Sequence, residues 1–215
     1  MYIAASITGQ TLDQALKNIE AAVSQQPDIL ELRIDYMKDL SEKALDRLLA
    51  ACELPVIVTN RHRDESGPDP KAGFKGLEIR RIAYLKQAID RRAAYVDVEA
   101  RHYHPFEKQT TKLIVSYHDF DKTPENLTSR YKMIKSLSNA DIAKFATKAV
   151  SEEDVRRMIE LIEQADTPII GICMGELGER TRLHPGNYLT FACLTKEQAS
   201  APGQFTVEQI REKLS

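Results

Sequence analysis

The most direct indication of chemistry in the sequence is a lysine that lies between apolar residues. Lys144 would be poorly solvated there, and a second cation nearby, such as Lys148 or Arg33, would further disfavour its charged form. A neutral amine is the nucleophile that attack on a ketone requires. The alternative is a structural lysine paired with Glu31 or Asp97 in the protein interior. The residues around Lys144 leave both interpretations open.

A histidine that could carry protons follows an apolar run at 112–117. His118 ends this run and precedes Asp119. Histidine is the side chain that titrates near neutral pH, so a histidine close to an amine nucleophile is a natural proton carrier. A single histidine is more often an ordinary surface or core residue. The interpretation therefore depends on His118 and Lys144 lying on neighbouring elements.

Charged side chains recur within other apolar runs. Because side chains alternate between the two faces of a strand, Glu31 and Arg33 share a face opposite the apolar residues. Asp97 and Glu99 repeat this pattern, and Arg61 ends another run. One such pair could be a solvated salt bridge, but buried charges are costly and rarely unpaired. Their repetition at the ends of several runs indicates a site.

A metal site is a weaker possibility. His102 and His104 form an H-x-H pattern, with Asp97 and Glu99 upstream as further ligands. The pattern is short, and a metal-dependent hydrolase is accordingly the least favoured enzyme class.

Eight β-branched runs alternate with amphipathic stretches along the chain. The expected strands are residues 2–7, 29–34, 55–60, 94–98, 112–117, 142–146, 168–173 and 189–194. The expected helices are residues 11–24, 41–51, 77–91, 124–136 and 151–164, with a last helix from about residue 206. This alternation predicts an α/β fold with a parallel sheet, and eight units predict a (β/α)8 TIM barrel. A doubly wound open sheet is disfavoured because no G-x-G-x-x-G follows the first run.

Composition limits the classes of function. The 215 residues carry 30 Lys and Arg against 32 Asp and Glu, a net charge of −2 that gives no reason to expect nucleic acid or an anionic membrane as partner. No linker divides the chain, so we expect a single domain over residues 1–215. The longest uncharged apolar stretch is far shorter than the roughly 20 residues of a membrane span. Charges near the N-terminus argue against a signal peptide, and three widely spaced cysteines in apolar stretches are typical of a reduced, cytoplasmic protein.

Six short motifs resemble those of type I 3-dehydroquinate dehydratases, the Schiff-base-forming dehydroquinases of the shikimate pathway. In chain order they are Glu31-Leu-Arg33-Ile-Asp35, Thr59-Asn-Arg61 followed by Glu65, Ser116-Tyr-His118-Asp-Phe120, Asp141-Ile-Ala-Lys144, Met174-Gly175 leading to Arg182, and Ala199-Ser200-Ala-Pro-Gly-Gln204. Each motif is short, but six in the same order over nearly the whole chain are specific.

The resemblance implies three catalytic residues. Lys144 would form an imine with the C3 carbonyl of 3-dehydroquinate. His118 would take the C2 proton and then protonate the departing C1 hydroxyl. Glu65 would hold His118 in orientation. The product would be 3-dehydroshikimate.

The resemblance also implies residues that bind the substrate. Arg182 would bind the carboxylate, with a fork geometry that lysine cannot reproduce. The remaining contacts would come from Glu31, Arg33 and Arg61, which would engage hydroxyls, and from Ser200 and Gln204 on a closing loop. That loop would exclude water from the iminium.

The expected protein is thus an enzyme of aromatic amino acid biosynthesis that acts on a small molecule. The resemblance implies no metal, nucleotide or flavin cofactor, and a homodimer as the assembly. The chain begins at the first strand, without the N-terminal hairpin of longer members, and Asn60 and Tyr117 depart from the family pattern. Two alternatives are a Schiff-base class I aldolase, which would need a phosphate site, and a catalytically silent ligand-binding paralogue.

Overall fold

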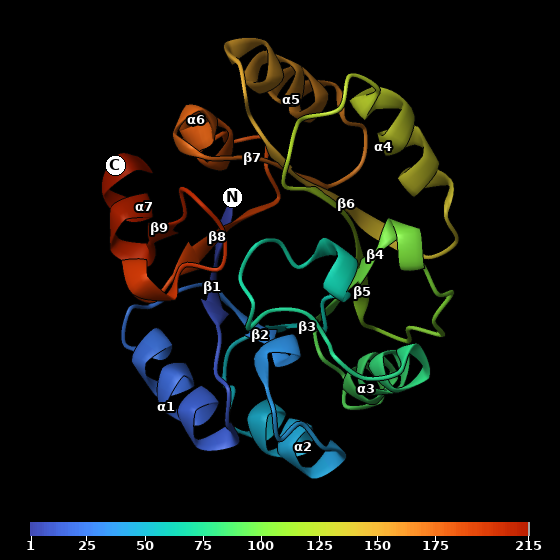
Figure 1. The fold of residues 1–215 in the computed structure, drawn as a ribbon, viewed down its shortest axis with the longest axis vertical. Coiled ribbons are helices and arrows are strands. Elements are labelled where there is room, and N and C mark those ends of the chain that lie inside the picture. Colours follow the sequence, from blue (N-terminus) through green and yellow to red (C-terminus); the bar gives the residue numbers. More distant parts are fainter. Residues whose placement is uncertain (215) are drawn as a thin grey trace.

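Parallel strands form the centre of the molecule and helices surround them (Figure 1). The computed structural model describes residues 1–214. Its strands are β1 (Tyr2–Ile7), β2 (Ile29–Arg33), β3 (Val56–Thr59), β4 (Tyr95–Glu99), β5 (Lys112–Asp119), β6 (Ala140–Lys148), β7 (Ile169–Met174), β8 (Leu189–Cys193) and β9 (Phe205–Thr206). They form one curled parallel sheet in the order β7-β6-β5-β4-β3-β2-β1-β8-β9. The predicted TIM-barrel class is confirmed, and the short β9 is an addition.

The barrel closes between β7 and β8, where the two strands form no regular ladder of backbone hydrogen bonds. There the backbone N–H of Tyr188 donates to the carbonyl of Ile169 at 2.8 Å, and Gly171 N–H donates to the Asn187 side chain at 2.7 Å. An amide side chain thus replaces part of the backbone pairing. These hydrogen bonds, rather than a parallel pairing of β7 with β8, close the barrel.

The helices lie outside the sheet, as Figure 1 shows. They are α1 (Leu12–Val23), α2 (Glu42–Ala50), α3 (Glu78–Asp90), α4 (Leu127–Ser136), α5 (Glu152–Gln164), α6 (Glu179–Arg182) and α7 (Val207–Leu214). Hydroxyl side chains of Thr11, Ser41 and Ser151 cap α1, α2 and α5 by accepting N–H groups that the first turn leaves unpaired. Five predicted helices agree with the structure to within three residues, whereas the four-residue α6 was not predicted. No helix among residues 1–214 has the length and apolar character needed to cross a membrane.

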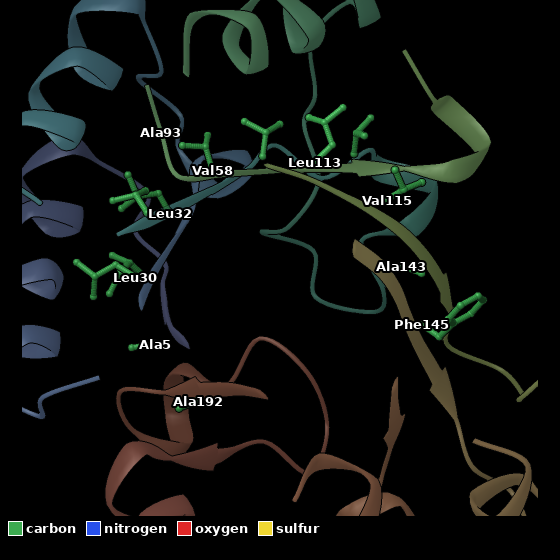
Figure 2. Packing of buried hydrophobic residues seen from close by; sticks show 14 of the residues in the cluster. Ala5, Leu30, Leu32, Val58, Ala93, Leu113, Val115, Ala143, Phe145 and Ala192 are labelled. Atoms are coloured by element: carbon green, nitrogen blue, oxygen red, sulfur yellow. The ribbon is translucent and has the colours of Figure 1, made fainter. Parts of the chain in front are cut away.

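The two faces of the sheet carry different side chains. Figure 2 shows Leu30, Leu32 and Val58 pointing away from the barrel interior, toward the surrounding helices. A smaller apolar cluster that includes Ile57 and Ile114 fills the interior toward the start of the strands. The buried charged side chains on the interior face lie toward the end where the strands finish.

A group of tyrosines lies where the strands begin. The hydroxyls of Tyr95 and Tyr188 are 2.8 Å apart, and the ring of Tyr2 packs against Tyr188 with 5.5 Å between centroids.

Candidate active site

A cavity opens at the end of the barrel where the strands finish. Its lining includes every residue predicted for the site: Glu31, Arg33, Arg61, Glu65, His118, Lys144, Arg182, Ser200 and Gln204. They come from β2, β5, β6, α6 and the segments after β3 and β8. In a parallel barrel these strand ends meet at one face, so residues far apart in sequence share one cavity.

Lys144 is buried and has an anionic neighbour. Its Nζ lies 2.8 Å from Asp97 Oδ2 and 4.1 Å from the centroid of the Phe191 ring. Lys148, which the sequence suggested as a cationic neighbour, is exposed at the end of β6. The pairing with Asp97 is the arrangement that the sequence analysis left open as its alternative. The structure thus orients the amine through a carboxylate.

Asp97 is held by two further donors. Its Oδ1 accepts hydrogen bonds from Arg61 Nη1 at 2.9 Å and from Ser116 Oγ at 2.6 Å. Burial disfavours its ionised form, but the charges of Arg61 and Lys144 hold the pKa of Asp97 well below its usual range. Asp97 is therefore an anion at all physiological pH values.

A second carboxylate, Glu99, also holds Arg61, and Arg81 in turn holds Glu99. Glu99 accepts from Arg61 Nη1 at 2.8 Å and from Arg81 Nη1 at 2.8 Å, and Arg81 Nη1 also donates to the Asn60 carbonyl at 3.0 Å. Arg81 is fully buried although it lies on α3. The buried position of Arg81 was not predicted from the sequence. Its place on the same helical face as the buried Tyr84 was the signal that could have identified it.

His118 is oriented by Glu65. Glu65 Oε2 accepts the backbone N–H of His118 at 2.9 Å and lies 3.1 Å from its ring Nδ1. Burial, together with the charges of Arg61 and Lys144, holds the pKa of His118 well below its usual range. The ring is therefore neutral near pH 7. With Nδ1–H directed at Glu65, the basic nitrogen is Nε2.

Arg182 is a buried cation without a counter-ion. Its Nη2 donates to the Pro202 carbonyl at 2.9 Å, and its Nε has no hydrogen-bond partner. Burial lowers its pKa to about 10, and among residues 1–214 no carboxylate offsets that effect. Arg33, by contrast, forms a bidentate pair with Asp35, both bonds being 2.9 Å long. Arg182 is thus the guanidinium in the cavity that is available for an anionic ligand.

Ser200 and Gln204 connect the segment before β9 to the barrel. Ser200 N–H and Oγ donate to Gln204 Oε1 at 2.8 and 3.2 Å, and Gln204 Nε2 donates to Ser6 Oγ at 3.4 Å. Ser6 in turn donates to Glu31 at 2.6 Å, and Thr59 donates to the other oxygen of Glu31 at 2.9 Å. The loop therefore reaches the cavity floor through hydrogen bonds.

The same loop packs closely on the segment after β7. Gly203 has a φ of +73°, and a Cβ there would lie 2.9 Å from the Gly175 carbonyl oxygen. Both features require glycine. This close contact holds the loop beside the segment after β7, at the opening of the cavity.

The structure does not assemble the H-x-H site suggested by the sequence. Asp97 and Glu99 are engaged by arginines, and His104 packs against Phe106 with 4.9 Å between ring centroids. His102 turns instead toward His62. Apolar residues of the cavity lining, among them Met174 and Phe191, were also not predicted.

Comparison with known proteins finds a family whose model matches nearly the whole chain. The family model described as type I 3-dehydroquinase matches residues 3–215. A 3-dehydroquinate dehydratase of Methanocaldococcus jannaschii is 37% identical over 221 residues, covering 96% of this chain and 94% of that protein.

Two solved structures share the fold. The 3-dehydroquinate dehydratase of Geobacillus kaustophilus superposes with a TM-score of 0.86 at 28% identity, covering 99% of this chain and 89% of that one. A type I 3-dehydroquinate dehydratase of Clostridium difficile, solved with covalently modified comenic acid, gives a TM-score of 0.86 at 26% identity and covers 99% and 90% of the two chains.

Proposed function

The chain belongs to the type I 3-dehydroquinase family, and we propose that it removes water from 3-dehydroquinate to give 3-dehydroshikimate through an imine on Lys144. The observation that carries this proposal is the composition of one cavity. A buried amine, a neutral histidine and an arginine without a counter-ion all line it. The amine can attack a ketone, the histidine can transfer a proton, and the arginine can bind a carboxylate.

Binding begins with the substrate carboxylate at Arg182. A carboxylate there would pair a guanidinium that is otherwise uncompensated, and the pairing would be strong because the site is buried. Fixing one end of the ring places the C3 ketone deeper in the cavity, near Lys144. Holding the ketone in position near the amine can supply a large part of the reduction in the activation barrier.

Imine formation follows from the pair of Lys144 and His118. The ammonium held by Asp97 gives up a proton, for which the neutral His118 ring is an acceptor in the same cavity. The amine attacks C3, and the former carbonyl oxygen leaves as water after it takes one proton from the nitrogen and one back from His118, which is then neutral again. The Asp97 carboxylate then stabilises the cationic iminium.

The elimination uses the same histidine twice. The iminium acidifies the protons at C2, and His118 Nε2 removes one of them to give an enamine. His118 then returns a proton to the C1 hydroxyl, which leaves as water. Hydrolysis of the conjugated imine releases the product and restores Lys144, so that the sum of the steps is the loss of one water.

Other lining residues would shape the site. Arg33 and Arg61 are already paired with carboxylates, so their role would be to position groups and set the local field. Glu31 would accept a substrate hydroxyl, and Ser200 with Gln204 would close the loop over the iminium. An aldolase is less well supported, because Glu176 and Glu179 in the segment after β7 would repel a phosphate, and the family model that matches the chain is that of a dehydroquinase.

The wider setting is proposed from family membership. We place the enzyme in the shikimate pathway, as a homodimer that needs no metal or nucleotide cofactor. Cys52, Cys173 and Cys193 are free thiols, which fits the predicted cytoplasmic location.

Borohydride trapping tests the mechanism. Wild-type protein treated with 3-dehydroquinate and borohydride should gain the mass of a reduced ligand, located by peptide mapping at Lys144. Lys148→Ala, a change on the same strand at an exposed position, should trap normally, and Lys144→Ala should not trap or turn over. Wild-type turnover by Lys144→Ala, or an adduct on another residue, would reject the imine assigned here.

A further inference from the structure

Three side chains that could bind a metal ion converge beside the active-site cavity. His62 follows β3, Asp64 lies in the 3-10 helix Arg63–Glu65, and His102 ends the 3-10 helix Ala100–His102. One ligand atom from each lies within 4.8 Å of the others. None of these residues has a role in the proposed dehydration.

The geometry suits a small divalent ion. His62 Nδ1 and Asp64 Oδ2 are 3.6 Å apart, close to the roughly 3.4 Å expected for two ligands bound tetrahedrally at about 2.0–2.1 Å. The His102 ring stacks on His62 at 3.7 Å between centroids and 22° between planes, so His102 must turn out of this stack to direct a nitrogen at an ion bound by His62. Asp64 is largely exposed, so its side chain can rotate to close the remaining gap.

The hydrogen bonds of His62 indicate which nitrogen an ion would use. The backbone N–H of Asp64 donates to Nδ1 at 3.2 Å, so Nδ1 carries the lone pair and Nε2 the proton, and an ion at Nδ1 would replace this hydrogen bond. Nε2 lies 3.9 Å from Glu78 Oε2, too far for a hydrogen bond, and Arg81 fixes that carboxylate with bonds of 2.7 and 2.8 Å. A metal-binding histidine commonly directs its second N–H at a carboxylate, and a small rotation of His62 would make Glu78 that partner.

We propose that His62, Asp64 and His102 form a binding site for a divalent transition-metal ion such as Zn²⁺. Two imidazoles and one carboxylate favour zinc, copper or nickel over magnesium or calcium, which prefer oxygen ligands. Water would complete the coordination on the open side. The site adjoins the catalytic machinery, because Asp64 precedes Glu65 in the chain and the His62 N–H donates to Glu99 at 2.9 Å.

Direct binding of Zn²⁺ tests the site independently of catalysis. Tag-free protein stripped with chelator is titrated with Zn²⁺ by calorimetry, and one equivalent should bind to the wild type. His102→Ala and Asp64→Asn should each weaken binding at least tenfold, since loss of a supporting residue alone typically costs about 10–100-fold. Circular dichroism checks that both variants are folded.

Matched controls distinguish this site from general histidine affinity. His184 is as exposed as His62, at 19% against 18%, and lies 3.5 Å from Glu163, but lacks a third ligand. His184→Ala and His104→Ala should bind Zn²⁺ like the wild type. The proposal is overturned if the wild type binds no Zn²⁺, if His102→Ala and Asp64→Asn bind it unchanged, or if the control variants lose it equally.

Discussion

Lys144 on β6 is paired with Asp97 on β4, two strands away, at 2.8 Å between Nζ and Oδ2. The intervening strand contributes Ser116, which donates to the same carboxylate at 2.6 Å. The carboxylate that orients the amine is therefore itself fixed by a neighbouring strand. The position of the Lys144 amine therefore depends on side chains of β4 and β5.

Asp97→Asn should disturb both stability and imine formation. Removing one member of a buried ion pair typically costs about 3–5 kcal/mol, because the partner charge stays buried. Arg61 keeps Glu99, so we expect a loss near the lower end, with slower borohydride trapping at Lys144. Urea unfolding and trapping rates measure the two effects. Asp46→Asn, which breaks an exposed pair with Arg91, is the control and should change neither.

His118→Ala should still form the imine, slowly, but stall before or after elimination. General acid–base groups contribute about 10²–10⁴-fold, so turnover should fall by that factor while the amine remains intact. Mass spectrometry during turnover should then show an accumulated covalent adduct. His184→Ala serves as a surface control. A normal rate without an adduct would assign the proton transfer to another residue, and Glu65 would be examined next.

Much of the fold follows from local patterns in the sequence. Period-two runs and capped amphipathic stretches predict the eight long strands and the six helices of eight or more residues, because each pattern is contained within the element that it describes. The two-residue β9 and the four-residue α6 carry too few residues for a period. They exist because tertiary contacts hold the chain there.

The charged residues that line the cavity were predicted from the sequence, whereas their pairing was left open or not predicted. Placing Glu31, His118 and Lys144 at one end of a barrel requires only strand alternation and parallel connections. The pairing of Lys144 with Asp97 depends on the register between strands, in which Ser116 faces Lys144 on one side and Glu99 on the other. Arg81 depends on how α3 packs on β3 and β4. Neither relationship is encoded in a single segment.

Glu65 should make stability depend on pH. Burial raises its pKa from 4.5 to about 7, so the folded state holds this proton more tightly than the unfolded chain. Folding stability is then lost as pH rises from about 4.5 to about 7, by about 3 kcal/mol in total. Glu65→Gln cannot ionise. Its stability relative to the wild type should therefore improve by that order between about pH 5 and pH 8.

Urea unfolding of the wild type and Glu65→Gln at the two pH values measures this difference. His118 contributes with the opposite sign because its pKa is lowered, and it contacts Glu65, so the same pair of proteins is also compared in a His118→Ala background. The exposed Glu153→Gln should show no comparable gain. An equal pH dependence of wild type and Glu65→Gln would mean that Glu65 is ionised without penalty.

Arg182→Lys tests the carboxylate contact. A lysine offers one compact charge where the guanidinium offers two parallel donors, so binding should weaken by about 1.5–3 kcal/mol, or roughly ten- to a hundredfold. The effect should appear mainly in KM, and trapping at saturating substrate should survive. A ketone analogue without the carboxylate should bind both proteins equally. Discrimination against that analogue by the variant would assign the anchor to Arg33 or Arg61.

Arg182→Met should make the ligand-free protein more stable while it loses function. The guanidinium is buried and has no counter-ion among residues 1–214, and the lowering of its pKa to about 10 reflects that cost. Replacing an uncompensated buried charge with an apolar chain of similar length is often stabilising, and we expect a gain of about 1–3 kcal/mol in the free energy of unfolding. The lost bond to Pro202 reduces the gain. Urea unfolding without ligand measures it, and substrate-dependent trapping measures the loss of binding. A variant less stable than the wild type would show that the Pro202 contact outweighs the buried charge, and that the anion site is not held at a cost in stability.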